Sequence, residues 1–219
     1  MDIEQARFNM VEQQIRPWDV LDQDVLDLLR QLRREDFVPE QYRALAFSDM
    51  EIPLGHGEAM LSPKLEARML QEVGVKAGDQ VLEVGTGSGY MTALLARMAH
   101  RGLVRSVEIV PEFTARAEAI LKQHGITNVD LEVGDAARGW QQGGPYDVIV
   151  LTGSVPVLPE AFQASLKVGG RLFAVVGDAP AMEAQLITCV AEGVYRSTNL
   201  FETSIPPLKN AMQPQRFMF

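Results

Sequence analysis

Apolar residues in the first third of the chain recur every three or four positions, which places them on one helix face and predicts three amphipathic helices. Their apolar positions are Phe8, Val11 and Ile15, then Val25, Leu28, Leu29 and Leu32, and finally Leu65, Met69 and Val73. Pro17 ends the first helix, and Asp22 is the expected N-cap of the second. The third helix is expected to begin at Pro63, with Ser62 as its N-cap. Residues 48–61 contain Pro53, Gly55 and Gly57 and are expected to form an irregular loop.

From residue 79 onward, short apolar runs alternate with amphipathic segments. The runs predict strands over residues 81–84, 104–109, 129–133, 146–151 and 171–176. Helices are predicted between them from the spacing of Met91, Leu94, Leu95 and Met98, of Phe113, Ala117, Ile120 and Leu121, and of Phe162 and Leu166. Strands that alternate with helices through short connections form a parallel sheet that is covered on both faces.

Residues 184–191 and 194–203 predict two more strands, which turn at Glu192-Gly193 into an antiparallel hairpin at the sheet edge. The prediction is therefore an α/β fold with a doubly wound, mostly parallel sheet of seven strands and an N-terminal helical extension. Residues 1–78 supply the helical extension and residues 79–219 the core, packed together as one structural domain. The sequence leaves open whether the tail from residue 205 folds back over the sheet rim.

Composition excludes several classes of protein. The chain has 219 residues with 20 basic and 29 acidic ones, a net charge of −9, which argues against nucleic-acid binding because phosphate neutralisation needs clustered Lys and Arg. Arg30, Arg33 and Arg34 form the densest basic group, but two acidic residues follow them, so a solvated helix end is expected. No apolar run approaches the roughly 20 residues of a membrane helix. The lone Cys189 is expected to be a buried thiol, and the protein is expected to be cytoplasmic.

A glycine-rich loop, Gly85-Thr86-Gly87-Ser88-Gly89, follows the first predicted parallel strand. Open α/β sheets bind ligands at this end of their strands, and glycine lets the backbone approach a ligand closely. A dinucleotide fingerprint would need glycine at position 90, which is Tyr90. Glu83 precedes the loop, and its carboxylate suits a cationic ligand better than a pyrophosphate. S-adenosylmethionine, which carries an ammonium and a sulfonium group and no phosphate, is therefore favoured over a nicotinamide dinucleotide.

Acidic residues also end the next two predicted strands. Glu108 is expected to accept from the ribose hydroxyls, and Asp135, with Ala136, is expected to bind the adenine. Thr152 follows the fourth strand and is expected to touch the cofactor or the acceptor. Glu83, Gly85, Thr86, Gly87 and Gly89 are assigned to the methionine part of the cofactor. The sequence thus predicts that Glu83, Glu108 and Asp135 share one rim of the sheet.

Several segments resemble the motifs of the protein-L-isoaspartate O-methyltransferase family, within the class I S-adenosylmethionine-dependent methyltransferases. They are residues 52–57 (IPLGHG), 84–90 (VGTGSGY), Gly134-Asp135 with Gly139-Trp140, and 166–172 (LKVGGRL). The resemblance implies a Rossmann-like methyltransferase fold. It implies S-adenosylmethionine as methyl donor, S-adenosylhomocysteine as product, and L-isoaspartyl residues of damaged proteins or peptides as acceptors, and hence a role in protein repair.

The acceptor loop, residues 56–62, departs from the family pattern. The family reads T-[IV]-S-x-P, whereas this chain has Ala59-Met60-Leu61-Ser62-Pro63, which puts Leu61 at the serine position. Ser62 either presents a displaced catalytic hydroxyl or serves only as a helix N-cap. His56 is a candidate base by location alone, and a structural histidine between glycines is preferred. A carboxylate acceptor is already ionised near pH 7, so the reaction needs positioning more than a base.

The change at Leu61 leaves alternatives open. The chain either methylates isoaspartyl residues, or uses another acceptor, or binds the cofactor without turnover. A nicotinamide-dependent oxidoreductase and a non-enzymatic interaction module are less favoured. Glu66 is placed to help fix the acceptor loop, and Lys64, Lys209 and Arg216 are candidates for attracting a substrate carboxylate. No set of His, Cys and carboxylate residues has metal-ligand spacing.

Overall fold

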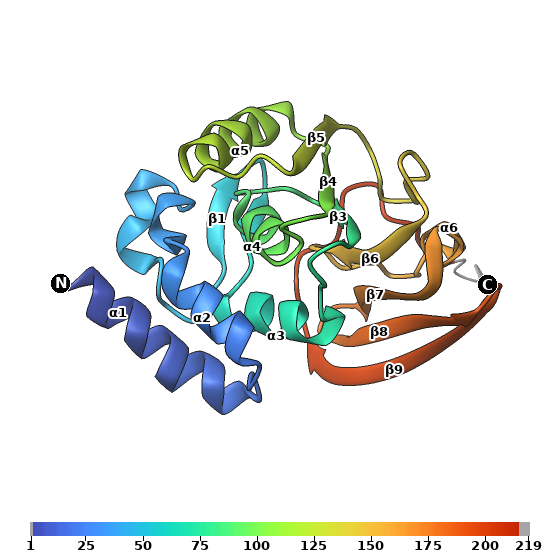
Figure 1. Ribbon diagram of the computed structural model, residues 1–219, viewed down its shortest axis with the longest axis horizontal. Coiled ribbons are helices and arrows are strands. Elements are labelled where there is room, and N and C mark those ends of the chain that lie inside the picture. Colours follow the sequence, from blue (N-terminus) through green and yellow to red (C-terminus); the bar gives the residue numbers. More distant parts are fainter. Residues whose placement is uncertain (1, 215–219) are drawn as a thin grey trace, which may run out of the picture.

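The computed structural model describes residues 2–214 and contains a seven-stranded sheet in the order β5-β4-β3-β6-β7-β8-β9 (Figure 1). The strands are β3 (Gln80–Val84), β4 (Leu103–Glu108), β5 (Val129–Val133), β6 (Tyr146–Leu151), β7 (Leu166–Asp178), β8 (Ala181–Ala191) and β9 (Val194–Thr203). Strands β5, β4, β3, β6 and β7 are parallel, and β8 and β9 add an antiparallel hairpin at the edge. The predicted doubly wound sheet is confirmed.

The helices are α1 (Ile3–Met10), α2 (Gln23–Gln31), α3 (Pro63–Val73), α4 (Tyr90–Met98), α5 (Pro111–Gln123) and α6 (Glu160–Ala164). Asp22 caps α2 as predicted, because its side chain accepts from the backbone N–H groups of Asp24 and Val25. Helix α3 begins at Pro63 with Ser62 at the N-cap position, but the Ser62 side chain makes no capping hydrogen bond. We call α1, α2 and the short helical turns up to Leu45 the N-terminal layer.

The prediction of an irregular loop over residues 48–61 is wrong. Strands β1 (Ile52–Gly55) and β2 (Glu58–Met60) pair there as an antiparallel hairpin. Ile52 and Leu54 are buried while Pro53 is exposed, which is the two-residue period of a half-buried strand. The turn is made by His56 and Gly57, both at positive φ (54° and 79°), which is the geometry that a tight hairpin turn requires.

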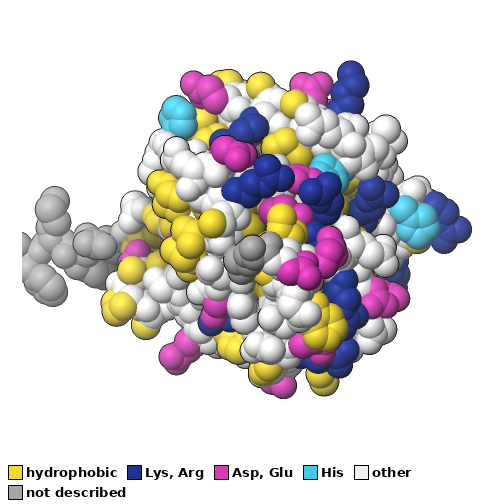
Figure 2. Space-filling model, turned by 90° about the vertical axis from the view of Figure 1, so that its left-hand side faces the viewer, with side chains coloured by type: hydrophobic (Ala, Val, Ile, Leu, Met, Phe, Trp, Pro, Cys, Tyr) yellow, Lys and Arg dark blue, Asp and Glu magenta, His cyan; other side chains and the backbone are white. Residues whose placement is uncertain are grey.

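The end of α6, the bounds of β7 and the environment of Arg34 also differ from the prediction. Leu166 is the first residue of β7 and does not belong to α6, and β7 is longer than the expected 171–176. Arg34 is not part of a solvated helix end, because its side chain is completely buried. Acidic and basic side chains intermingle on the face toward the N-terminal layer (Figure 2).

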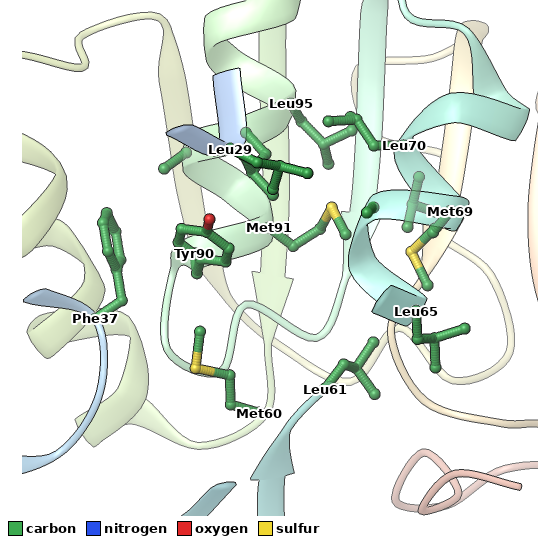
Figure 3. Packing of buried hydrophobic residues seen from close by; sticks show 14 of the residues in the cluster. Leu29, Phe37, Met60, Leu61, Leu65, Met69, Leu70, Tyr90, Met91 and Leu95 are labelled. Atoms are coloured by element: carbon green, nitrogen blue, oxygen red, sulfur yellow. The ribbon is translucent and has the colours of Figure 1, made fainter. Parts of the chain in front are cut away.

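Two apolar cores cover the two faces of the sheet. On one face, side chains of the N-terminal layer, α3, α4 and α5 pack on residues such as Val81 and Val148, and Figure 3 shows part of this cluster. On the other face, a smaller cluster includes Ile149, Phe162 of α6, and Cys189, which is buried as predicted. Within the described residues, none of the helices is long and apolar enough to cross a membrane.

Candidate functional site

A cleft lies at the carboxyl ends of the parallel strands, and its two parts adjoin at the glycine loop. The outer cleft is lined by predicted cofactor residues, namely Gly85, Gly87, Glu108, Asp135, Ala136 and Thr152. The inner cleft lies between the glycine loop and the acceptor loop and includes Ala59, Met60, Leu61, Glu66, Thr86 and Met91. Ala59, Leu61 and Thr152 border both parts. The fold therefore brings the predicted cofactor residues and the acceptor loop to one place.

Glu108 and Asp135 lie at the outer cleft as predicted for strand-end acids. The carboxylate of Glu108 accepts from the backbone N–H groups of Gly87 at 2.8 Å and Val110 at 2.9 Å. Asp135 accepts from the N–H of Ala137 at 3.0 Å, and its side chain is exposed at the mouth. Both carboxylates are held by the backbone, so their orientation is set before a ligand arrives.

Gly85 and Gly89 show two different reasons for glycine in the loop. At Gly85, φ is +98° and a Cβ would lie 2.2 Å from the Thr152 hydroxyl, which itself donates to the carbonyl oxygens of Val84 and Gly85. At Gly89, a Cβ would lie 2.9 Å from that of Ala117 on α5. Gly89 therefore permits helix packing and does not line the cleft, in contrast to the expected contact with the cofactor.

Glu83 also differs from the expectation, because its carboxyl group does not face the cleft. Its side chain is completely buried and accepts from the hydroxyl groups of Thr92 on α4 and Ser106 on β4. Side chains alternate along a strand, and Glu83 shares its face with Val81 on the side that α4 covers. Burial raises the pKa of Glu83 to about 8. Glu83 therefore supports the strand and helix beside the loop, and only Glu108 and Asp135 lie at the rim.

The acceptor loop presents apolar side chains to the cleft. Met60 and Leu61 are buried, and in Figure 3 Met60 lies beneath Tyr90 while Leu61 lies on the side of Leu65. The side chain of Ser62 lines neither part of the cleft. The loop is therefore not reshaped to present the Ser62 hydroxyl in place of the family serine.

The remaining polar candidates have partners outside the inner cleft. His56 occupies the hairpin turn and is exposed, with its ring edge-to-face on Phe113 at 5.5 Å. Lys64 forms an ion pair with Asp49 at 2.7 Å. Lys209 pairs with Glu58 at 2.9 Å, and Arg216 lies outside the described residues. Between residues 2 and 214, no three His, Cys, Asp or Glu side chains gather in a way that could hold a metal ion.

The C-terminal tail, whose course the sequence left open, contributes to the cleft. Residues 206–209 line the outer cleft, where Leu208 donates its N–H to Ser154 at 2.9 Å. Asn210 donates from its side-chain amide to Oδ2 of Asp135 at 2.8 Å, while Oδ1 accepts from Ala137. The tail therefore does fold back over the sheet rim. Lining residues that the sequence did not indicate include Leu54, Glu58, Val107, Ile109 and Phe113. The alternation of Ile52 and Leu54 was a usable signal for Leu54.

The sheet topology and the site together define a class of protein. A glycine loop after the first parallel strand, a carboxylate that ends the next strand and an acidic residue after the third meet at a single cleft. The loop has glycine at alternate positions and Tyr90 where a dinucleotide fold needs glycine. These features are those of a class I methyltransferase.

Comparisons with known proteins specify the family. The sequence model of "Protein-L-isoaspartate(D-aspartate) O-methyltransferase (PCMT)" matches residues 5–210. A protein-L-isoaspartate O-methyltransferase of Rhodopseudomonas palustris (strain HaA2) is 39% identical over 203 residues, which are 92% of this chain and 82% of that protein. The enzyme of that name from Anaeromyxobacter dehalogenans (strain 2CP-C) is 41% identical over 191 residues, 86% of this chain and 90% of that one.

Two solved structures have folds similar to that of this chain. A protein-L-isoaspartate O-methyltransferase superposes with a TM-score of 0.79 at 26% identity, over 94% of this chain and 65% of that chain. A Plasmodium falciparum protein, solved in complex with S-adenosyl-L-homocysteine, has the same fold, with a TM-score of 0.80 at 21% identity over 93% of this chain and 98% of that one. The chain belongs to the protein-L-isoaspartate(D-aspartate) O-methyltransferase family.

Proposed function

We propose that this protein is an S-adenosylmethionine-dependent carboxyl O-methyltransferase that acts on L-isoaspartyl residues of damaged proteins and peptides. The observation that carries the proposal is the family match over residues 5–210, which includes every lining residue of the cleft. The same match supports protein or peptide acceptors and a role in repair. A cytoplasmic location belongs to the proposal and is supported by the single cysteine, which forms no internal disulfide.

The lining residues fit the cofactor. A Cβ at Gly85 would collide with the Thr152 hydroxyl, so glycine lets the loop lie directly against Thr152 while both residues line the cleft. When bound, S-adenosylmethionine supplies an activated methyl group. We assign Glu108 to the ribose hydroxyls, and Asp135 with Ala136 to the adenine. Gly85, Thr86, Gly87 and Thr152 are assigned to the methionine part, at the border between the outer and inner cleft.

The acceptor side of the cleft favours the reaction by excluding water. An isoaspartyl carboxylate is ionised near pH 7 and loses its charge as the methyl ester forms. An apolar surrounding is less unfavourable to the neutral ester than to the ion, and Met60 and Leu61 supply such a surrounding. No base is required, so the position of the carboxylate oxygen is the main contribution that this chain makes.

The test is methyl transfer from labelled S-adenosylmethionine to an isoaspartyl peptide, with the matched α-aspartyl peptide as control. The proposal predicts a base-labile methyl ester on the isoaspartyl peptide alone. Binding of S-adenosylhomocysteine without any ester on that peptide would contradict the proposal and would favour another acceptor.

The variant Leu61→Ser tests the departure from the family loop. Because the Leu61 side chain already borders both parts of the cleft, a serine hydroxyl there would face the acceptor. We expect turnover to rise by about tenfold, which corresponds to one hydrogen bond to a charged group. Leu65→Ser, in the same core but outside both parts of the cleft, is the control for the loss of an apolar side chain. Equal effects of the two substitutions on turnover would contradict the prediction.

A further inference from the structure

Arg34 is a fully buried charged residue that joins several parts of the fold. It lies in a short helical turn of the N-terminal layer. Its Nε donates to the carbonyl oxygen of Ala46 at 2.9 Å, its Nη2 to the carbonyl oxygen of Leu61 at 2.6 Å, and its Nη1 to the carboxylate of Glu66. The guanidinium also lies over the ring of Tyr90, 4.9 Å from the centroid. One side chain thus links the N-terminal layer to the acceptor loop, α3 and α4.

Stability alone does not explain an ion pair at this place. Removing two charges from water is costly, and well-packed apolar side chains of similar volume are often equally stable or more so. The best-attested benefit of a buried polar pair is that it selects one arrangement over others. Arg34 and Glu66 have side-chain exposures of 0% and 3%, so neither charge gains from water. What this pair fixes is therefore the position of the groups that it bonds.

The acceptor loop has few other restraints near Leu61. The pairing of β1 with β2 ends at Met60, opposite Ile52. Ser62 follows at the N-cap of α3 without a capping bond from its side chain. The Leu61 carbonyl lies between these two positions and accepts from Arg34, while the Leu61 side chain borders both parts of the cleft. A shift of this carbonyl would move the wall against which the acceptor packs.

We propose that Arg34 is a positioning residue for methyl transfer, which holds the Leu61 carbonyl and, with Glu66 as its counter-charge, sets the acceptor wall of the cleft. The role rests on the proposed function. Arg34 uses three nitrogen donors of one planar guanidinium at once. A lysine ammonium on a flexible stem does not reproduce this geometry. The N-terminal layer therefore contributes to the reaction although none of its side chains lines the cleft within the described residues.

Arg34→Lys tests the role because it keeps the positive charge beside Glu66 but removes the planar set of guanidinium N–H donors. We expect kcat on the isoaspartyl peptide to fall about 10- to 100-fold, as for a small misplacement of a reacting group. The dissociation constant of S-adenosylhomocysteine should stay near the wild-type value. Arg7→Lys is the matched control, since Arg7 is also buried in the N-terminal layer but pairs with Glu35 at 2.5 Å, away from the loop. Equal losses of kcat in the two variants would overturn the proposal.

Amide hydrogen exchange gives a readout that does not depend on turnover. Peptides that cover residues 56–62 should exchange faster in Arg34→Lys than in the wild type and in Arg7→Lys. If wild-type protein fails to methylate the isoaspartyl peptide, the proposed function fails, and the positioning role is then decided by exchange alone. Unchanged exchange in Arg34→Lys would overturn it. If Arg34→Lys does not fold, Arg34→Met/Glu66→Met removes both charges and carries the same expectations.

Discussion

Glu83 and Glu66 are both buried carboxyl groups, but the structure compensates them differently. Glu66 has Arg34 as a counter-charge, although burial still raises the pKa of Glu66 to about 7. Glu83 accepts only from the hydroxyl groups of Thr92 and Ser106, and its second oxygen has no partner among the described residues. With its pKa raised by burial to about 8, Glu83 holds a proton at neutral pH. A residue that the sequence assigned to a cationic ligand is thus a neutral hydrogen-bonding group of the core.

This assignment predicts how stability depends on pH. The folded-state pKa of Glu83 lies above the ordinary value of 4.5, so between these two values the folded protein binds more protons than the unfolded one. The contribution of Glu83 is therefore fully present below pH about 4.5 and is lost as the pH rises through about 8. Between these pH values, the free energy of unfolding should decline less steeply with pH in Glu83→Gln than in the wild type. The two slopes should differ by up to about 1.4 kcal/mol per pH unit.

Urea denaturation of the two proteins at several pH values measures this difference. The glutamine amide of Glu83→Gln has two N–H donors where the protonated carboxyl has one, and no acceptor among the described residues lies beside this position, so the variant should be less stable than the wild type at low pH by about 1–3 kcal/mol. The gap should then shrink as the pH rises. Parallel stability curves from pH 5 to 8 would mean that Glu83 is ionised in the folded protein.

At the scale of elements, the cleft is closed by two segments that lie far apart in the sequence. The β1–β2 hairpin meets the C-terminal tail through Lys209, whose ammonium group donates to the His56 carbonyl at 3.0 Å and pairs with Glu58 at 2.9 Å. The tail is held at its other side by Ser154, which accepts from the N–H of Leu208. Hairpin and tail together thus form a cover over the outer cleft.

Lys209→Met should loosen this cover. The Lys209 and Glu58 side chains are 38% and 27% exposed, so water screens the ion pair and its contribution is only about 0–1 kcal/mol. We expect thermal stability to change little and the dissociation rate of S-adenosylhomocysteine to rise about two- to fivefold, as measured by stopped-flow displacement. Lys122→Met, an exposed lysine on α5 away from the cleft, should leave the rate unchanged. An unchanged rate in Lys209→Met would show that the contact does not restrain ligand exit.

At the scale of the whole molecule, the N-terminal layer and the sheet share one apolar core. The larger cluster contains Met10 and Leu29 of the N-terminal layer together with Val148 and Phe173 of the sheet. Trp18 extends this contact to the far edge, where its ring packs edge-to-face on Phe201 of β9 at 5.0 Å. We therefore propose that residues 1–78 and 79–219 unfold as a single cooperative unit.

The two tryptophans of the chain report on this prediction, because they lie on opposite faces of the sheet. Trp140→Phe leaves Trp18 as the probe of the N-terminal layer, and Trp18→Phe leaves Trp140 as the probe of the other face. In guanidinium chloride, fluorescence and circular dichroism should give the same midpoint for each variant, as expected of two-state unfolding. In Trp140→Phe, the Trp18 fluorescence could instead change at a lower guanidinium chloride concentration than the circular dichroism. That result would identify the N-terminal layer as a separate unit.

The sequence by itself determined the elements and the class of the site. Periods of 3.6 and 2 residues depend on local geometry, so the helices and the parallel strands were predictable, as was the edge hairpin after Gly177. Gly85, Gly87, Glu108 and Asp135 were predictable as well, because parallel strands bring their carboxyl ends to one rim whatever the details of packing.

Only the tertiary structure decided which way individual side chains face and what covers the cleft. Glu83 lies one residue before the end of its strand, and alternation turns it under α4, where burial raises its pKa. The tail contacts and the reach of Arg34 to Leu61 join residues far apart in the chain. Such pairings leave no periodic signal in the sequence, because they depend on how complete elements pack.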